Sequence, residues 1–218
     1  MVYYLPFEDG AGNSTLTNYG TVVGAATMDN DETTSVFSTD TPSSLNSTYS
    51  RDFPMGANTT DGPMLILPDS ASRLNLNTLG DAMTISAWIK WDGEDGHTDA
   101  RQGIVSKLNS SQNQAWGFSV QNDGQLQVDW TRAAGGGGNR YTTAAITTGA
   151  WTHVALRYST DSDYGIRIYI NGVDAGLSQS YTGSGALVAS GETIRVGALT
   201  PDNIFPVNSL PQAELHHL

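Results

Sequence analysis

Apolar and polar residues alternate along most of this chain, and no stretch sustains the period of a helix. Short apolar runs are bounded by Gly, Asn, Asp, Ser and Thr, which is typical of strands joined by turns. The strands that we expect are Val2–Phe7, Thr21–Met28, Ser35–Ser38, Met64–Leu67, Met83–Trp91, Gly103–Lys107, Ala115–Gln121, Gln125–Thr131, Arg140–Ile146, Trp151–Tyr158, Ile166–Ile170 and Ile194–Gly197. About a dozen short strands without helices predict an all-β protein, an antiparallel sandwich of two sheets.

The clearest hairpin runs from Trp151 to Gly172. Side chains of its first strand alternate between a core set and an outward set, which are Val154, Leu156 and Tyr158 against Trp151, His153 and Arg157. In its second strand, three isoleucines alternate with Arg167 and Tyr169. Asn171-Gly172 follows and tolerates positive φ, as a tight turn requires. One face of the hairpin therefore belongs to a core, and the other carries cations and aromatic rings.

We expect a single domain over residues 1–218 with two zones of different regularity. Residues 1–62 predict irregular sheet edges and long loops, whereas residues 63–198 carry the clear strands. Asn122-Asp-Gly predicts a hairpin turn. The glycines of 135–138 predict a flexible loop tip.

Composition narrows the classes of partner. Ten basic residues against 22 acidic ones give a formal net charge of −12. Phosphate contacts need clustered Lys and Arg, so nucleic acid and anionic membranes are disfavoured as partners. The chain has no cysteine, which excludes thiol catalysis and disulfide bonds. No apolar run approaches the roughly 18 residues of a membrane span, so membrane insertion is not expected.

The first residues bear on location. Met1–Pro6 has neither a basic nor an apolar leader region, so no signal peptide is visible. We expect an extracellular or virion-surface protein. Its leader lies outside this chain, or it needs none, as for a virus particle assembled inside a cell.

Five segments in order carry a family resemblance: MLILPDSASRLNLNTLGDAMTISAWIKWDG, GIVSKLN, WGFSVQNDGQLQVDW, GAWTHVALRYSTDSDYGIRIYINGVDAG and TIRVGA. Across Asp61 to Ala198 they resemble the laminin-G-like branch of the concanavalin A-like lectin/glucanase superfamily. The resemblance implies a jelly-roll of two curved antiparallel sheets. It implies little about activity, because this fold hosts lectins, adhesion modules, calcium-dependent receptors and glucanases.

The C-terminus departs from that family pattern. Such domains close with a full strand, whereas Asn203–Leu218 reaches only the beginning of that region. We expect Glu214–Leu218 to be the first half of an incomplete strand beside the N-terminal one. The open sheet position would then be filled by another chain pairing with residues 212–218, or by a remainder of the protein.

A glucanase needs two carboxylates alternating on one strand. The chain has five glutamates, and none has a carboxylate two residues away on a predicted strand: Glu8, Glu32, Glu94, Glu192 and Glu214. Spacing does not exclude a Ser-His-Asp triad, but no nucleophile elbow is present, and we interpret His153 as structural. The protein is therefore expected not to be an enzyme.

Calcium is the metal that the chain favours, because hard cations bind several oxygens in a loop. Two acidic loops offer candidate ligands, which are Asp92, Glu94, Asp95 and Asp99 in the first and Asp161 and Asp163 in the second. Asp9 is a third candidate. The alternative is that these aspartates only form turns.

Strand parity separates core aromatics from candidate binding residues. Trp116 and Trp130 share faces with apolar neighbours and are expected in the core. The candidate ligand-binding set faces away from the core and comprises Trp88, Lys90, His153, Arg157, Arg167, Tyr169 and Arg195. Aromatic faces stack on sugar rings and planar polar groups bind hydroxyls. The alternative is a solvated face on which arginine stems cover apolar surface.

Two functions remain from the sequence. The first is a recognition or adhesion module that binds a carbohydrate or a surface protein. The second is a structural accessory or decoration protein of a virus or phage particle, docked through the incomplete sheet edge onto a capsid protein.

Overall fold

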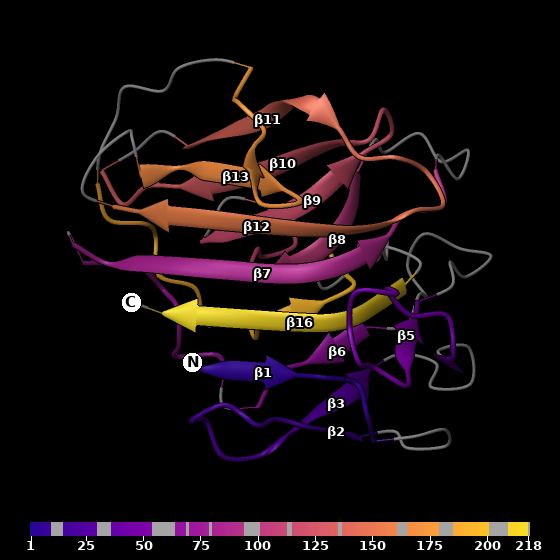
Figure 1. Ribbon diagram of the computed structural model, residues 1–218. Coiled ribbons are helices and arrows are strands. Elements are labelled where there is room, and N and C mark those ends of the chain that lie inside the picture. The colour runs from indigo at the N-terminus through magenta and orange to yellow at the C-terminus, as the bar shows by residue number, and fades with distance from the viewer. Residues whose placement is uncertain are drawn as a thin grey trace.

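The protein consists of two antiparallel β-sheets packed face to face, as the sequence predicts (Figure 1). The structure is a computed structural model, which describes residues 1–9, 15–29, 36–53, 64–68, 70–78, 80–93, 101–112, 115–134, 137–160, 165–178, 185–200 and, for the backbone, 209–217. Within these residues no helix has the length and apolar character needed to cross a membrane.

The front sheet faces the viewer in Figure 1 and contains the hairpin that runs from Trp151 to Gly172. Its strand order is β14 (Val173–Asp174), β13 (Arg167–Ile170), β12 (Trp151–Ser159), β7 (Ala82–Lys90), β16 (Ser209–His217), β5 (Ser50–Asp52) and β4 (Val36–Ser38), with β1 (Tyr3–Leu5) also paired to β16. The back sheet has the order β11 (Gly137–Ala145), β10 (Gln125–Thr131), β9 (Trp116–Gln121), β8 (Arg101–Ser106), β15 (Arg195–Val196), β6 (Met64–Ile66), β3 (Ala25–Asp29) and β2 (Thr15–Thr17).

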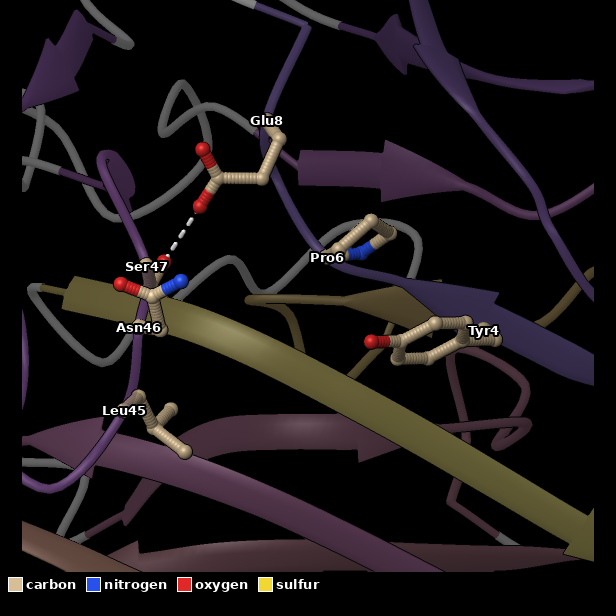
Figure 2. Close-up of a pocket in the computed structure, with 6 residues that line it drawn as sticks. All are labelled: Tyr4, Pro6, Glu8, Leu45, Asn46 and Ser47. Carbon is tan, nitrogen blue, oxygen red and sulfur yellow. Dashed lines mark hydrogen bonds between the residues drawn. The ribbon is translucent and has the colours of Figure 1, made fainter.

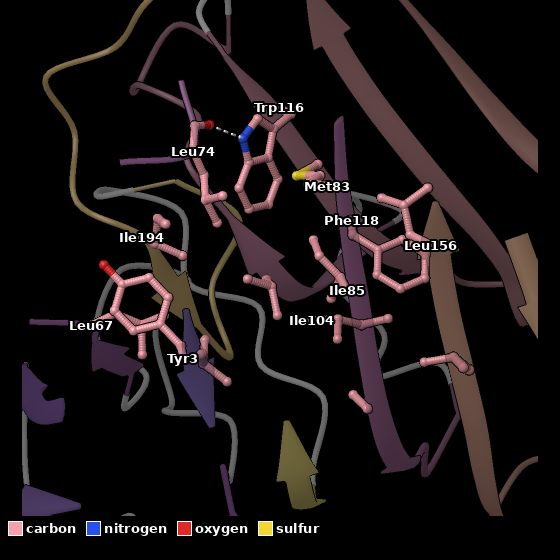
Figure 3. Packing of buried hydrophobic residues seen from close by; sticks show 14 of the residues in the cluster. Tyr3, Leu67, Leu74, Met83, Ile85, Ile104, Trp116, Phe118, Leu156 and Ile194 are labelled. Atoms are coloured by element: carbon pink, nitrogen blue, oxygen red, sulfur yellow. Dashed lines mark hydrogen bonds between the residues drawn. The ribbon is translucent and has the colours of Figure 1, made fainter. Parts of the chain in front are cut away.

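The core lies between the two sheets (Figure 3). Every second residue of β7 is buried, namely Met83, Ile85, Ala87 and Ile89, while the residues between them stay partly exposed. Burying an aliphatic side chain of this size contributes roughly 1.5–3 kcal/mol. Trp116 and Trp130 are buried as predicted, and the Trp116 indole N–H donates to the Leu74 carbonyl at 2.8 Å. Alternation thus fixes which face of each long strand joins the core.

The two predicted turns have the expected backbone. Asn171 and Gly172 adopt positive φ values of 50° and 79° between β13 and β14. Gly124 has a φ of 81° in the hairpin that joins β9 and β10. The predicted loop tip at 135–138 is corrected in part, because Gly137 and Gly138 belong to β11 and the other two lie outside the described residues.

The predicted open position in the front sheet is wrong. β16 pairs along β7, from Ser209 opposite Lys90 to His217 opposite Met83. On its other edge it pairs with β1, with Leu215 opposite Tyr3. The expected neighbour of the N-terminal strand is correct, but the chain itself fills the position, and no second chain is needed there.

The outer face of the back sheet is covered over β8 and β9. The Ser106 hydroxyl, at the end of β8, donates to the carbonyls of Ala198 and Leu199 at 2.9 and 2.6 Å. A Cβ at Gly103 would lie 2.3 Å from the Ala198 carbonyl carbon, so only glycine permits this close crossing. The front sheet therefore offers the more open face.

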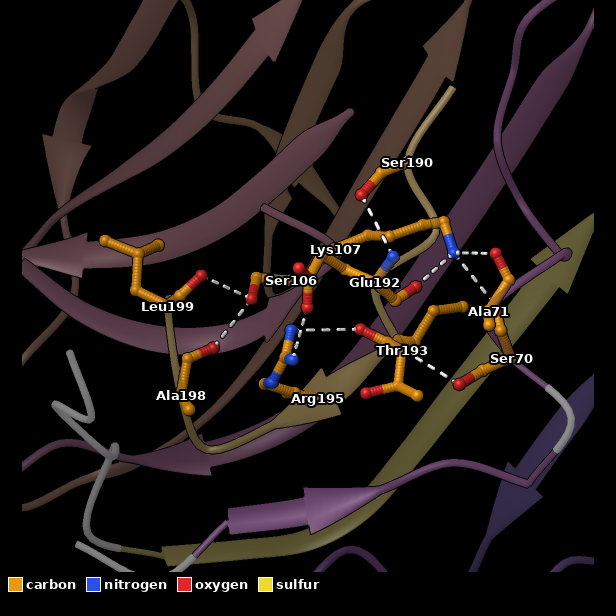
Figure 4. A network of polar contacts seen from close by, with 11 residues as sticks. Ser70, Ala71, Ser106, Lys107, Ser190, Glu192, Thr193, Arg195, Ala198 and Leu199 are labelled. Carbon is orange, nitrogen blue, oxygen red and sulfur yellow. Dashed lines mark hydrogen bonds and ion pairs between the residues drawn. The ribbon is translucent and has the colours of Figure 1, made fainter. Parts of the chain in front are cut away.

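Lys107 follows β8 and is fully buried (Figure 4). Its ammonium donates to the main-chain carbonyls of Ser70, Ala71 and Glu192 at 2.8, 2.9 and 2.6 Å. Burial lowers the pKa of Lys107 to about 8; the nearby Arg195 also lowers it and Glu192 opposes this. A single cation thus ties together three segments that are distant in sequence.

Candidate functional site

The outer face of the front sheet brings most of the predicted binding residues together. In the register, Trp88 lies opposite His153, Ser86 opposite Ala155, and Ala155 opposite Tyr169. The six predicted residues that this face carries are Trp88, Lys90, His153, Arg157, Arg167 and Tyr169, all at least partly exposed. Their alternation with buried residues on β7, β12 and β13 explains why parity located them.

Trp88 and His153 form the centre of the face. Their rings meet edge to face, with centroids 5.5 Å apart and planes inclined by 60°. The His153 Nε2 atom lies 2.8 Å from the Ser86 hydroxyl oxygen. The His153 main-chain N–H donates to the Asn171 side-chain oxygen at 3.0 Å. The ring contact with Trp88 and the Ser86 hydroxyl fix the imidazole, so the face presents an ordered aromatic and polar surface.

Asp40 anchors the rim of this face. It follows β4 and accepts from the Lys90 ammonium at 2.5 Å and from the Trp151 indole N–H at 2.9 Å. The hydrogen bond from Lys90, and then that from Trp151, lowers the pKa of the Asp40 carboxyl. The same carboxylate raises the pKa of Lys90. The charge of Lys90 is therefore compensated, and Lys90 acts here by positioning the 39–49 segment.

Two arginines give the other end of the face a positive charge. Arg157 of β12 lies directly opposite Arg167 of β13. The Arg167 Nε atom lies 3.5 Å from an Asp174 carboxylate oxygen. Arg157 is exposed and forms no ion pair with any described residue. Its guanidinium can therefore bind an anionic group from solution.

Arg195 does not belong to this face, which corrects the prediction. It lies in β15 of the back sheet, is only 6% exposed and pairs with Glu192 at 2.7 Å. A strand of two residues has no alternation that could assign it to a sheet. The alternation of side chains shows whether a residue points toward the core or away from it, but it does not show to which sheet the strand belongs. The prediction therefore assigned Arg195 to the wrong sheet.

A pocket that the sequence did not indicate opens beside β1 (Figure 2). Its volume is about 310 Å³, and it is lined by Tyr4, Pro6, Glu8, Leu45, Asn46 and Ser47. One Glu8 carboxylate oxygen, Oε1, accepts from the Ser47 hydroxyl at 2.5 Å and from the main-chain N–H of Thr48 at 2.9 Å. The loop from Leu45 to Ser47 shows no strand pattern, and only the fold brings it to β1.

Polar groups on the outer face of the back sheet bind one another. Arg101 pairs with Asp129 at 2.7 Å and donates to Gln112 at 2.5 Å. Gln127 donates to the second Asp129 oxygen at 2.8 Å. Burial raises the pKa of Asp129, and Arg101 opposes that shift. This network leaves fewer polar groups for a ligand than the front face does.

The calcium prediction is not resolved by the geometry. Asp92 is exposed just after β7, while the other predicted ligands lie outside the described residues: Glu94, Asp95, Asp99, Asp161 and Asp163. The described residues hold no group of three or more His, Cys, Asp or Glu side chains placed for a metal. Asp9, the third candidate, accepts from the Thr17 main-chain N–H at 3.1 Å. Calcium binding stays a prediction.

Comparison with known protein families identifies the superfamily of this chain. A laminin G family model, described as concanavalin A-like lectin/glucanases superfamily, matches residues 60–206. The chain belongs to this superfamily. A search of curated protein sequences found no significant match.

Solved structures with a fold similar to that of this chain include the following three. The binding domain of botulinum neurotoxin serotype G has a TM-score of 0.63 and 10% identity, covering 99% of this chain and 47% of that one. A structure entitled "Cell entry of botulinum neurotoxin type C is dependent upon interaction with two ganglioside molecules" has a TM-score of 0.61 and 13% identity, with 99% and 47% covered. A heptameric SAP-like pentraxin from Limulus polyphemus has a TM-score of 0.50 and 21% identity, with 75% and 73% covered.

These similarities show the fold alone. This chain spans about half the length of the toxin structures that it matches. The serotype G structure is a binding domain, whereas the superfamily name also includes glucanases. The function must therefore be argued from the site.

Proposed function

We propose that this protein is a non-catalytic recognition domain that binds carbohydrate through the outer face of the front sheet. The observation that carries the proposal is the contact of Trp88 with His153, held by Ser86 on a partly exposed sheet surface. Sugar rings stack their C–H faces on aromatic rings and donate hydroxyl protons to fixed polar groups. Tyr169, one strand further on, extends the aromatic surface.

The charge of the face favours an acidic glycan. Arg157 and Arg167 lie opposite each other, and Arg157 is exposed. A guanidinium binds a carboxylate or sulfate with two parallel hydrogen bonds. Binding of ganglioside by neurotoxin type C concerns a longer protein, so it supports only the class of ligand.

We propose a non-catalytic role because the sequence lacks the spacing of carboxylates that a glycosidase uses. A glycosidase needs two of them facing the same sugar bond. No glutamate of this chain has a carboxylate two positions away on a predicted strand. The serotype G neurotoxin structure, which shares the fold, is a binding domain.

Location and metal content belong to the same proposal. A glycan-binding face suits an extracellular surface, where glycans are displayed. We propose that any calcium is a structural ion held at one of the two acidic loops, the loop of Asp92, Glu94, Asp95 and Asp99 or the loop of Asp161 and Asp163. The alternative of a virus decoration protein relied on an open sheet position, and β16 occupies that position.

A glycan array tests the proposal directly. The wild-type chain, with and without calcium, should bind a subset of carboxylated or sulfated glycans. Trp88→Ala should weaken that binding about tenfold, since a stacked ring contributes roughly 1 kcal/mol beyond its buried area. Tyr141→Ala, at a half-buried tyrosine of the back sheet, is the matched control and should bind like the wild type. Absence of wild-type binding under both conditions would refute the proposal.

A further inference from the structure

The pocket beside β1 lies on the same face of the front sheet as Trp88, across β16. Tyr4 is opposite Glu214 in the register, and Glu214 is opposite Ser86. Tyr3 and Leu5 are buried while Tyr4 is half-exposed, so Tyr4 points outward as Ser86 does. Two strand spacings separate them, a distance of about 10 Å. A ligand of more than one sugar can span that distance.

We propose that this pocket is a second subsite, which receives a neutral, hydroxyl-rich sugar of the same glycan. The inference rests on the proposed function of the face. It adds that the ligand is an oligosaccharide lying across β16, with its acidic unit toward Arg157 and a neutral unit beside β1.

The lining of the pocket suits one sugar ring. Tyr4, Pro6 and Leu45 provide an apolar wall, while Glu8, Asn46 and Ser47 provide polar groups (Figure 2). A volume of about 310 Å³ lies at the small end of the range for ligand pockets, roughly 300–1,000 Å³. An apolar wall opposite convergent polar groups is the arrangement that stacks a sugar and binds its hydroxyls.

Glu8 decides the charge of the bound unit. Its Oε1 atom accepts from Ser47, Thr48 and Tyr49, which fixes the carboxylate in place. Its Oε2 atom accepts no hydrogen bond from a described residue. A fixed carboxylate oxygen accepts from sugar hydroxyls and repels a second carboxylate or a sulfate. The pocket therefore excludes the acidic unit, which binds near Arg157.

One segment joins the two subsites. At one end of residues 39–49, Asp40 binds Lys90 and Trp151 beside the Trp88 cluster. Near the other end, Ser47 binds Glu8 in the pocket. The Leu45 N–H donates to the Pro42 carbonyl at 3.0 Å and closes a turn between them. This segment forms a shared wall along the face.

Calorimetric titration of three variants tests the inference. The probes are acidic glycans of one, two and three sugar units, taken from a sialylated and a sulfated series. Glu8→Gln keeps the oxygen that binds Ser47 and replaces the free acceptor, so the fold is retained. We expect Glu8→Gln and Tyr4→Ala to weaken the longer probes about tenfold, as expected when a polar contact or a stacked ring is lost. Binding of the one-unit probe should not change.

Trp88→Ala separates the two hypotheses. It should weaken all three probes, because it removes the shared platform. If Trp88→Ala weakens binding while both pocket variants bind every probe like the wild type, the second subsite is refuted and the proposed function stands. If the wild type binds none of the probes, both fail. A thermal melt of each variant confirms that it is folded.

Discussion

At the scale of residues, a buried cation links the chain at the ends of three neighbouring strands of the back sheet, β6, β15 and β8. The ammonium of Lys107 bonds three carbonyl groups, from Ser70, Ala71 and Glu192, and its three protons are all used. Ser70 adds a second link, because its hydroxyl accepts from the Ile194 N–H at 2.8 Å. The connection is electrostatic as well as directional, because an ammonium group is a cation with three hydrogen-bond donors and no acceptor.

Replacing Lys107 should destabilise the protein strongly. Lys107→Met fills similar volume but leaves three buried carbonyl oxygens without a donor, which should cost roughly 3 kcal/mol or more of unfolding free energy. Urea denaturation followed by tryptophan fluorescence measures it. Lys90→Met, which removes a half-exposed ion pair with Asp40, should cost less than about 1 kcal/mol. Equal losses in the two variants would contradict the role of Lys107.

The stability should also depend on pH through Lys107. Its pKa is about 8 when folded, below the ordinary 10.5, so the unfolded chain holds more protons between these values. The unfolding free energy of the wild type should therefore rise, relative to Lys107→Met, by about 2 kcal/mol from about pH 7 to about pH 9.5. Subtracting the variant cancels the other titrating groups. A difference that stays constant or falls would contradict the lowered pKa.

Residue-scale prediction from the sequence succeeded where alternation was long enough to read. β7 and β12 each have nine residues, and their parity placed Trp88 and His153 on the outer face. Arg195 failed because two residues carry no period. Lys107 follows a strand as an ordinary lysine in sequence, and only the fold brings the carbonyl groups of two distant turns to it.

At the scale of elements, the 39–49 segment depends on a few polar contacts. Asp40 holds one end through Lys90 and Trp151, and Glu8 holds the other through Ser47. The lowered pKa of Asp40 keeps its contribution present above the ordinary carboxyl value of 3.8, with loss only as pH falls through the lower folded value. The segment should therefore stay anchored under mildly acidic conditions.

Removing the Asp40 anchor should loosen the segment without unfolding the sheets. Asp40→Ala leaves the Trp151 indole and the Lys90 ammonium without their acceptor. Hydrogen exchange of the amides of residues 41–49 should become faster, because a locally held segment opens at a cost well below global unfolding. Asp123→Asn, in the back-sheet hairpin, should leave that exchange unchanged. Unaltered exchange in Asp40→Ala would show that Asp40 does not anchor the segment.

Element prediction depended on apolar content as well as on length. Long alternating strands were found within a few residues, and so were the three-residue strands β4 and β6, which contain apolar residues. The strands β2 and β5 also have three residues each, but their polar sequences have no readable pattern. The pocket was missed for a related reason. Its two walls come from β1 and from an irregular loop, and sequence alone does not indicate how a loop is folded over a sheet.

At the scale of the whole molecule, the two outer faces differ in what they leave available. The back face is crossed by a chain segment, and Arg101 forms an ion pair with Asp129 on it. The front face keeps an exposed arginine on a protein of net charge −12. A local positive charge on an acidic protein selects anions by short-range contact, because the protein as a whole repels them.

Binding of an acidic glycan should therefore weaken with salt. Raising sodium chloride from about 50 to about 500 mM shortens the screening length severalfold and should lower the affinity severalfold. Arg157→Gln should bind more weakly at low salt and lose most of this dependence. Arg140→Gln, on β11 of the back sheet, serves as the control and should match the wild type. Salt-independent binding by the wild type would contradict a role for Arg157.

The fold of the whole molecule was largely predictable, because five segments in order carry the superfamily pattern. The completion of the front sheet by β16 was not predictable in the same way. The sequence showed that the last residues could form a strand beside the first, yet nothing local showed that nine residues would run the length of β7. Pairing between the two ends of a chain is set by tertiary packing, which local patterns do not encode.

That pairing has a consequence for synthesis. Of the described strands, β1 leaves the ribosome first, and within the described residues its strand partner is β16, with Tyr3 opposite Leu215. Contacts of such sequence separation close slowly, because the loop entropy must be paid before the contacts form. The nascent front sheet thus keeps two unpaired edges, on β1 and β7, until β16 has been synthesised. Completion of the front sheet should therefore wait for the synthesis of β16, and a chaperone that masks strand edges should raise the yield of folded protein.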